Sequence, residues 1–119
     1  MRTKGARLRI FLHRFRMGDE PMFLWTCANE AGDWLHALGT HEIDCFLARD
    51  FLMELLAEAD FPIGSITTGG NSAFCDPEAP QAMWHLFPKV CRKQGVVPIV
   101  DPTMPSEPAP VVAGWADVG

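Results

Sequence analysis

Residues 40–60, THEIDCFLARDFLMELLAEAD, have the clearest helical pattern in the chain and constrain the fold more than any other feature. The segment is rich in leucine, methionine, alanine and glutamate, which favour helices. Thr40 is the predicted N-cap, because its hydroxyl can accept a hydrogen bond from a free N–H of the first turn. Glu42 and Asp44 fall in that turn, where negative charge suits the helix dipole. The sequence therefore predicts one long helix that organises the rest of the fold.

The two sides of this predicted helix differ in character. One side repeats apolar residues at helical spacing and predicts a core face: Cys45, Ala48, Phe51, Leu52, Leu55, Leu56 and Ala59. The other side carries an acidic stripe one turn apart: Asp50, Glu54 and Glu58. Ile43, Phe46 and Leu47 also fall on that second side, so we expect the first half of the helix to be deeply packed. Pro62 ends the helix, because proline disfavours a helical residue before it.

The segments before the helix predict strands. Residues 6–16 alternate apolar and basic positions, which is typical of a strand with one face in a core. Residues 22–28 read as a second strand, joined to the first in an antiparallel hairpin by a connection of about five residues. Residues 29–39 fit either a turn and a short third strand or one to two helical turns. The turn and strand are preferred, because Gly32 weakens a helix.

Beyond the central helix, residues 63–68 are β-branched and predict a strand, and residues 73–75 could return after a turn. Asp76 begins a second predicted helix that runs to about residue 94, with a kink near Trp84 caused by Pro88. Gly95 is its predicted stop. Residues 96–100 predict a last strand at a sheet edge, because proline cannot donate to a ladder.

This order of elements predicts an α+β fold: a mainly antiparallel sheet of four to five strands with two helices packed on one face. Residues 1–100 are the predicted domain. Residues 101–119 contain four of the ten prolines, so we expect a Pro-rich extended or disordered tail.

The charge of the chain is strongly polarised. The net charge is −5 at pH 7, yet the first sixteen residues contain no acid. Six of the ten basic residues lie there: Arg2, Lys4, Arg7, Arg9, Arg14 and Arg16. Positions 17–119 carry four basic and all fifteen acidic residues, a net charge of −11. Most of the surface should therefore repel phosphate, which argues against direct nucleic-acid binding.

Cysteine usage and hydropathy indicate the compartment. No apolar run approaches the length of a membrane span, and Arg14 and Arg16 interrupt any signal-peptide core. We therefore expect a cytoplasmic protein whose four cysteines are free thiols. Four cysteines and four histidines are enough ligands for a metal, but there is no C-x-x-C or H-x-x-x-H spacing. We predict no metal site and no cofactor.

Three further features bear on chemistry. Cys75, beside a predicted helix N-terminus and followed by His85, has the composition of a Cys–His nucleophilic pair. The loop of residues 67–71, TTGGN, could form a backbone anion site, but a hairpin turn explains Gly69, Gly70 and Asn71 fully. The basic N-terminal strand could hold nucleic acid, with Phe11, His13 and Phe15 available for stacking, or be a solvated edge strand.

No motif ties the chain to one chemistry, and its residues identify no family. We predict a small, non-enzymatic inhibitor or adaptor that occupies a surface of a larger complex through the acidic stripe and Trp115. In size and acidity the chain resembles small inhibitors of phages and mobile elements, including anti-CRISPR and anti-restriction proteins. This resemblance in kind implies a protein partner with a basic surface. A thiol enzyme using Cys75 and His85, and a nucleic-acid accessory protein using the basic strand, stay open as alternatives.

Overall fold

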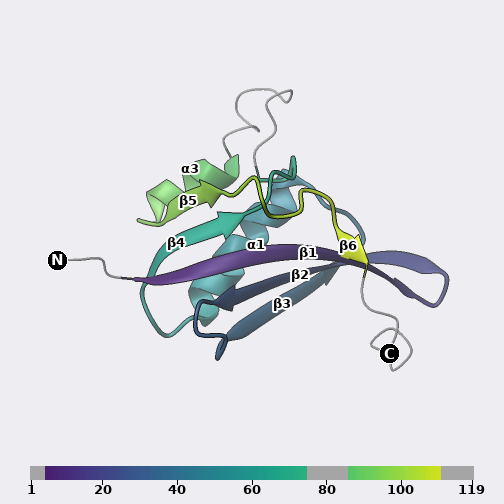
Figure 1. Cartoon of the computed structure of the whole chain (residues 1–119), viewed down its shortest axis with the longest axis horizontal. Coiled ribbons are helices and arrows are strands. Elements are labelled where there is room, and N and C mark those ends of the chain that lie inside the picture. Colours follow the sequence, from purple (N-terminus) through teal and green to yellow (C-terminus); the bar gives the residue numbers. More distant parts are fainter. Residues whose placement is uncertain (1–4, 75–85, 111–119) are drawn as a thin grey trace.

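The computed structural model describes residues 5–74 and 86–110 and has an α+β fold (Figure 1). Its elements, in chain order, are β1 (Ala6–Met17), β2 (Glu20–Asn29), β3 (Leu35–Thr40), α1 (Cys45–Glu58), β4 (Ile63–Thr68), α3 (Leu86–Lys93), β5 (Val97–Val100) and β6 (Ala109–Pro110). The preferred turn and strand within residues 29–39 is confirmed by β3. Among the described residues, no helix is long and apolar enough to span a membrane.

The sheet is mixed, with the strand order β3-β2-β1-β4-β5 and with β6 on β1. The β1–β2 and β2–β3 pairs are antiparallel, whereas β1–β4, β4–β5 and β1–β6 are parallel. This sheet is less antiparallel than the sequence suggested. The crossover through α1 returns the chain in the direction of β1, so β4 must pair with β1 in parallel.

The β1–β2 hairpin is tighter than expected. Its register continues to Met17 opposite Glu20, so only Gly18 and Asp19 form the turn. Gly18 has a φ of +66°, which glycine adopts without strain and which suits the first position of a two-residue hairpin turn. The expected five-residue connection was wrong because residues 17 and 20–21 continue the ladder.

Helix α1 begins later than the sequence predicted. Its N-cap is Asp44, whose Oδ1 accepts a hydrogen bond from the Leu47 N–H at 2.8 Å. Thr40 instead ends β3: its hydroxyl accepts from Trp25 Nε1 at 2.8 Å and donates to the Glu42 carbonyl at 2.6 Å. The predicted Thr40 cap is therefore wrong, because its hydroxyl is used to satisfy the indole of a buried tryptophan.

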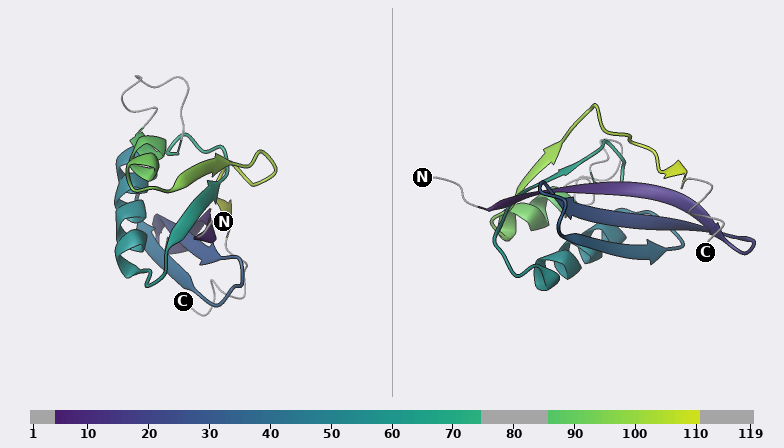
Figure 2. Two further views of the ribbon diagram at one scale, coloured as in Figure 1. Left: turned by 90° about the vertical axis from the view of Figure 1, so that its left-hand side faces the viewer. Right: turned by 60° about the horizontal axis from the view of Figure 1, so that its bottom comes forward.

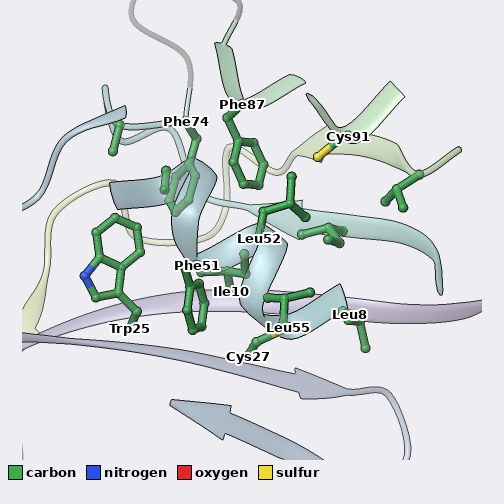
Figure 3. Packing of buried hydrophobic residues seen from close by; sticks show 14 residues of the cluster. Leu8, Ile10, Trp25, Cys27, Phe51, Leu52, Leu55, Phe74, Phe87 and Cys91 are labelled. Carbon is green, nitrogen blue, oxygen red and sulfur yellow. The ribbon is translucent and has the colours of Figure 1, made fainter. Parts of the chain in front are cut away.

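Both helices pack on one face of the sheet, as expected, and the core lies between the two layers. Figure 3 shows the main contacts. Trp25 packs beside two aromatic rings, with its centroid 5.8 Å from that of Phe51 and 6.0 Å from that of Phe74. The predicted core residues Phe51, Leu52 and Leu55 are fully buried, and Leu56 packs against the cluster while partly exposed.

The first turn of α1 is less deeply packed than expected. Phe46 is 46% exposed, and the Arg49 guanidinium lies 5.6 Å from its ring centroid. Ile43 and Leu47 are only partly buried. The sheet covers one side of the helix, so Ile43 and Leu47 reach only the margin of the core cluster and Phe46 lies outside it.

Helix α3 ends as predicted. Gly95 has a φ of +78°, its N–H donates to the Arg92 carbonyl, and the Val96 N–H donates to the Cys91 carbonyl at 2.8 Å. These two bonds form a Schellman motif, which needs a left-handed residue at this position. The predicted start of this helix at Asp76 and the expected kink lie outside the described residues.

Residues 101–108, which we call the strap, connect β5 to β6. The Asp101 N–H donates to the Thr68 carbonyl at 2.9 Å, and Met104 is buried at 8% exposure. Strand β6 then pairs with β1 beside His13 and Arg14. Within the strap, the Met104 N–H donates to the Asp101 carbonyl at 3.1 Å and closes a turn, and most of the strap residues are exposed. Residues 111–119 lie outside the described part of the chain.

Candidate functional site: the helix-free face of the sheet

Within residues 5–74 and 86–110, one face of the sheet has no helix on it, and both views in Figure 2 show α1 and α3 on the other side. We call it the helix-free face. Strand alternation places Arg7, Arg9, Phe11, His13 and Phe15 on this helix-free face, because Leu8 and Ile10 point into the core. The alternation in the sequence had placed Arg7, Arg9, Phe11 and His13 on one side of a strand. The structure adds that neither α1 nor α3, the two helices of the described residues, covers that side.

The register extends this face across five strands. Arg9 lies opposite Ala28, which lies opposite Leu35, and on the other side Arg9 lies beside Thr67, itself beside Ile99. A second row joins Phe11, Thr26 and Ala37. The immediate neighbours of Arg9 and Phe11 on this face are therefore small or hydroxyl side chains. The longer arginine and phenylalanine side chains extend beyond them.

The charged groups of this face have weak partners. Arg7 lies 3.6 Å from Glu30, and both side chains are largely exposed, so this ion pair contributes little to stability. His13 Nε2 lies 3.2 Å from the Thr26 hydroxyl, which orients the ring. Arginines held this loosely can exchange their partners for a phosphate.

A second feature lies at the carboxyl end of β4. From β1 the chain continues to β2 and β3 on one side of β1, and β4 and β5 then lie on the other side. The strand order therefore reverses between β1 and β4, and this boundary is a topological switch point. Open α/β sheets bind ligands in the crevice outside the carboxyl ends of strands at such points. The TTGGN segment lies here: Thr67 and Thr68 end β4, and Gly69, Gly70 and Asn71 form the loop that follows. It does not form the hairpin turn suggested as its plain explanation, because β4 pairs with β5 in parallel.

The side chains at this crevice are mostly engaged. Thr68 is 1% exposed, and its hydroxyl donates to the Gly69 carbonyl at 3.0 Å. Asp101 follows β5, and its Oδ1 accepts from the Thr103 hydroxyl at 2.6 Å and the Thr103 N–H at 2.8 Å. These bonds, with the Arg9 charge nearby, lower the pKa of Asp101 below its ordinary value of 3.8.

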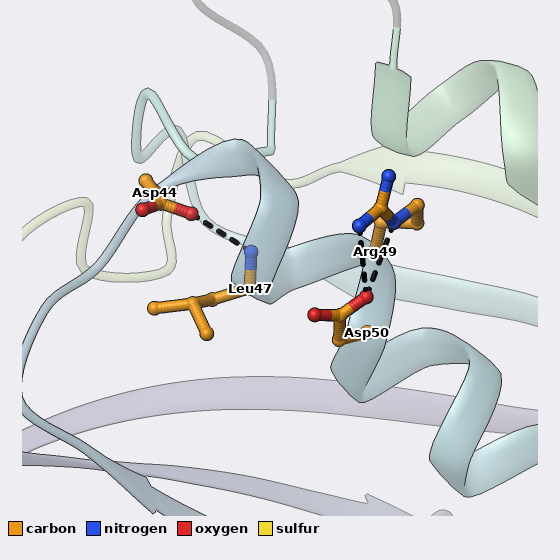
Figure 4. A network of polar contacts seen from close by, with 4 residues as sticks. All are labelled: Asp44, Leu47, Arg49 and Asp50. Atoms are coloured by element: carbon orange, nitrogen blue, oxygen red, sulfur yellow. Dashed lines mark hydrogen bonds and ion pairs between the residues drawn. The ribbon is translucent and has the colours of Figure 1, made fainter.

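The acidic stripe is exposed but not free of partners (Figure 4). Asp50 Oδ1 accepts from Arg49 Nη2 at 3.0 Å and from Arg49 Nε at 3.1 Å, so Asp50 has a cationic partner on its own helix. The guanidinium bends along the helix surface to reach its neighbour. Glu54 Oε1 lies 2.5 Å from His36 Nε2 on β3. Glu58 is exposed at the end of α1.

The described residues include only some of the candidate thiol and metal-ligating side chains. Cys27, Cys45 and Cys91 are buried free thiols, and burial raises the pKa of Cys27 and of Cys91 to about 12. Cys75 and His85 lie outside the described residues, as does Trp115. Within residues 5–74 and 86–110, no three His, Cys, Asp or Glu side chains form a group that could hold a metal ion.

Comparison with known proteins identifies the fold. No family model matches the sequence, and no curated protein matches it. The HTLV-2 integrase catalytic core domain in complex with magnesium is similar in structure, with a TM-score of 0.68 at 7% identity over 82% of this chain and 60% of that chain. The BIV integrase catalytic core gives a TM-score of 0.64 at 10% identity over 87% of this chain and 59% of that one.

A chain of the simian T-cell lymphotropic virus intasome in complex with PP2A regulatory subunit B56 gamma gives a TM-score of 0.66 at 14% identity. It is matched over 82% of this chain and 32% of its own length. The protein therefore has the fold of retroviral integrase catalytic cores and spans at most about three fifths of the chains it resembles.

The magnesium of the HTLV-2 core raises the question of whether the residues here fit such an ion. Mg²⁺ prefers oxygen ligands, usually with one or more carboxylates. At the carboxyl ends of β4 and β5, the described side chains are those of Thr68, Asn71 and Asp101, and the Asp101 carboxylate is held by Thr103. These residues do not fit a magnesium site, since they offer one engaged carboxylate and a buried hydroxyl.

Proposed function

We propose that this chain is a nucleic-acid-binding domain of integrase-core fold, with DNA as its substrate class. The observation that carries the proposal is the helix-free face, on which β1 carries Arg7, Arg9 and Phe11 among small side chains. Arginines can neutralise backbone phosphates, and an exposed aromatic ring can stack on a base. The presence of the same fold in integrase cores and in an intasome complex supports DNA as the substrate class.

The net charge of the protein does not oppose this proposal as strongly as the sequence suggested. At physiological ionic strength, charges separated by more than about 8 Å are largely screened. The acids of α1 lie on the opposite side of the sheet from Arg7 and Arg9. The local charge of the helix-free face, rather than the net charge, therefore governs the approach of a phosphate backbone.

The test is fluorescence anisotropy with labelled single-stranded and duplex DNA at several salt concentrations. The double variant Arg7→Gln/Arg9→Gln should weaken binding and reduce the magnitude of the slope of log K against log salt by roughly 1.4–1.8, the loss of two phosphate contacts. Arg49→Gln is the matched control, because Arg49 lies on α1. No binding at low salt, or equal binding by both variants, would contradict the proposal.

The role of Phe11 has a separate test. Phe11→Leu keeps an apolar side chain on the half-buried position but removes the aromatic face. Binding of single-stranded DNA should weaken by about 1–3 kcal/mol, the usual contribution of one stacked base. An unchanged affinity, with circular dichroism confirming the fold, would remove stacking from the proposal and leave only phosphate contacts.

The proposal concerns binding, and non-enzymatic action and a cytoplasmic location stay predictions. The inhibitor of a larger complex, including its anti-CRISPR-type form, also stays a prediction. It depends on the acidic stripe, and the contacts of Asp50 with Arg49 and of Glu54 with His36 neither favour it nor exclude it.

A further inference from the structure

The strap lies on the same side of the sheet as the proposed DNA-binding residues. Both views in Figure 2 show it arching away from the helices between β5 and β6. It crosses the carboxyl end of β4 and reaches β1 beside His13. Asp101 and Glu107 make the segment acidic, and no basic residue lies within residues 101–110. An acidic segment therefore runs next to the most basic strand of the protein.

The strap fills the crevice at the switch point. A Cβ built on Gly69 would overlap the Pro105 carbonyl oxygen, so the strap backbone lies directly against the backbone of Gly69. Asn71 Nδ2 donates to the Ser106 carbonyl at 2.9 Å, and Asn71 Oδ1 accepts from the Ala73 N–H at 2.8 Å. The TTGGN loop, which the sequence offered as an anion site, is thus covered by carbonyl oxygens of the chain itself.

The attachment of the strap is weak for its length. Pro102, Pro105 and Pro108 have no N–H and cannot add ladder hydrogen bonds. A segment with few backbone bonds and mostly exposed residues opens at low free energy compared with the core. The buried Met104, the two-residue β6 ladder and the bonds to Thr68 and Asn71 are contacts that hold it in the closed position.

We propose that the strap is an autoinhibitory segment: closed, it fills the crevice at the end of β4 and holds its negative charge near the exposed Arg9 side chain, which weakens the attraction of that side chain for DNA. Opening the strap removes its negative charge from Arg9 and exposes the TTGGN loop to the phosphate backbone. The inference rests on the proposed DNA binding, whose regulation it describes.

The decisive experiment locks the strap shut. A Cβ built on Gly70 lies 4.0 Å from Ser106 Cβ, which is within the range for a disulfide. Gly70→Cys/Ser106→Cys, in a Cys75→Ser background, should form this bond on oxidation, while the buried thiols of Cys27 and Cys91 stay unreactive. The oxidised protein should bind DNA more weakly than the same protein after reduction. For each single-cysteine variant, the DNA affinity should be the same after oxidation and after reduction.

The converse experiment opens the strap. Gly69→Ala places a methyl group against the Pro105 carbonyl, whereas Gly70→Ala, with no atom nearer than 4.0 Å, is the matched control. Hydrogen exchange of the Met104, Ser106 and Glu107 amides should be faster in Gly69→Ala only. If the strap is open about a tenth of the time in the native protein, DNA binding should tighten by up to about tenfold. Asn71→Ser, which shortens the donor to Ser106, is a second opening variant.

The outcomes separate this inference from the proposed function. If the native protein binds DNA and the oxidised and reduced double-cysteine proteins bind equally, the strap does not gate binding. Faster hydrogen exchange of the strap amides in the opening variants, without tighter DNA binding, would also show that the strap does not gate binding. If the native, reduced and opened proteins all fail to bind, the proposed function is wrong and the autoinhibition falls with it.

Discussion

Truncating Leu55 on α1 tests the two-layer packing directly. Leu55 is fully buried between the helix and the sheet. Leu55→Ala removes three carbons, and at about 0.8 kcal/mol for each the lost transfer free energy is about 2.4 kcal/mol. The cavity left behind adds to this value, so we expect a loss of about 2–5 kcal/mol in the free energy of unfolding. Such a loss is a large part of the total stability of about 5–15 kcal/mol that a domain of this kind has.

Urea titration followed by circular dichroism measures this loss. Met53→Ala is the control, because Met53 lies on the same helix but is 44% exposed. It should cost less than about 1 kcal/mol, as surface substitutions do. In thermal unfolding, Leu55→Ala should lower the midpoint by at least roughly 6 °C. A loss below about 0.5 kcal/mol for Leu55→Ala, or equal losses for the two variants, would refute the packing of α1 on the sheet.

Two further predictions concern the buried thiols and the end of α3. Cys27 and Cys91 should be alkylated only after unfolding, as mass spectrometry of native and denatured samples will show; rapid native labelling would mean that they are accessible. Because burial raises their folded-state pKa from 9.0 to about 12, the contribution of these two thiols to the free energy of unfolding should be constant below pH 9.0 and fall as the pH rises toward 12. Gly95→Ala should cost about 1–2 kcal/mol in a urea titration, because alanine is strained at a φ of +78°. A cost near zero would show that the Schellman motif does not form in solution.

The sequence by itself determined the features that depend on neighbouring residues. The alternation in residues 6–16, the β-branched run of β4, the buried face of α1 and the stop at Gly95 were all predicted correctly. Each is local: side-chain periodicity sets which face is buried, and backbone preferences set where a helix ends. The same side-chain alternation predicted that the basic and aromatic residues of β1 share one side of the strand.

Tertiary structure alone decided the features that join distant segments. Thr40 bonds to Trp25 across the sheet rather than capping α1, and the parallel β1–β4 pair follows from a crossover between residues far apart in the chain. The same pairing brings Arg9 beside Thr67 and lays the strap over Gly69. Local patterns fix which face of a strand is buried, but not which strand lies beside it. The candidate DNA-binding face, which combines five strands, therefore became apparent only in the folded sheet.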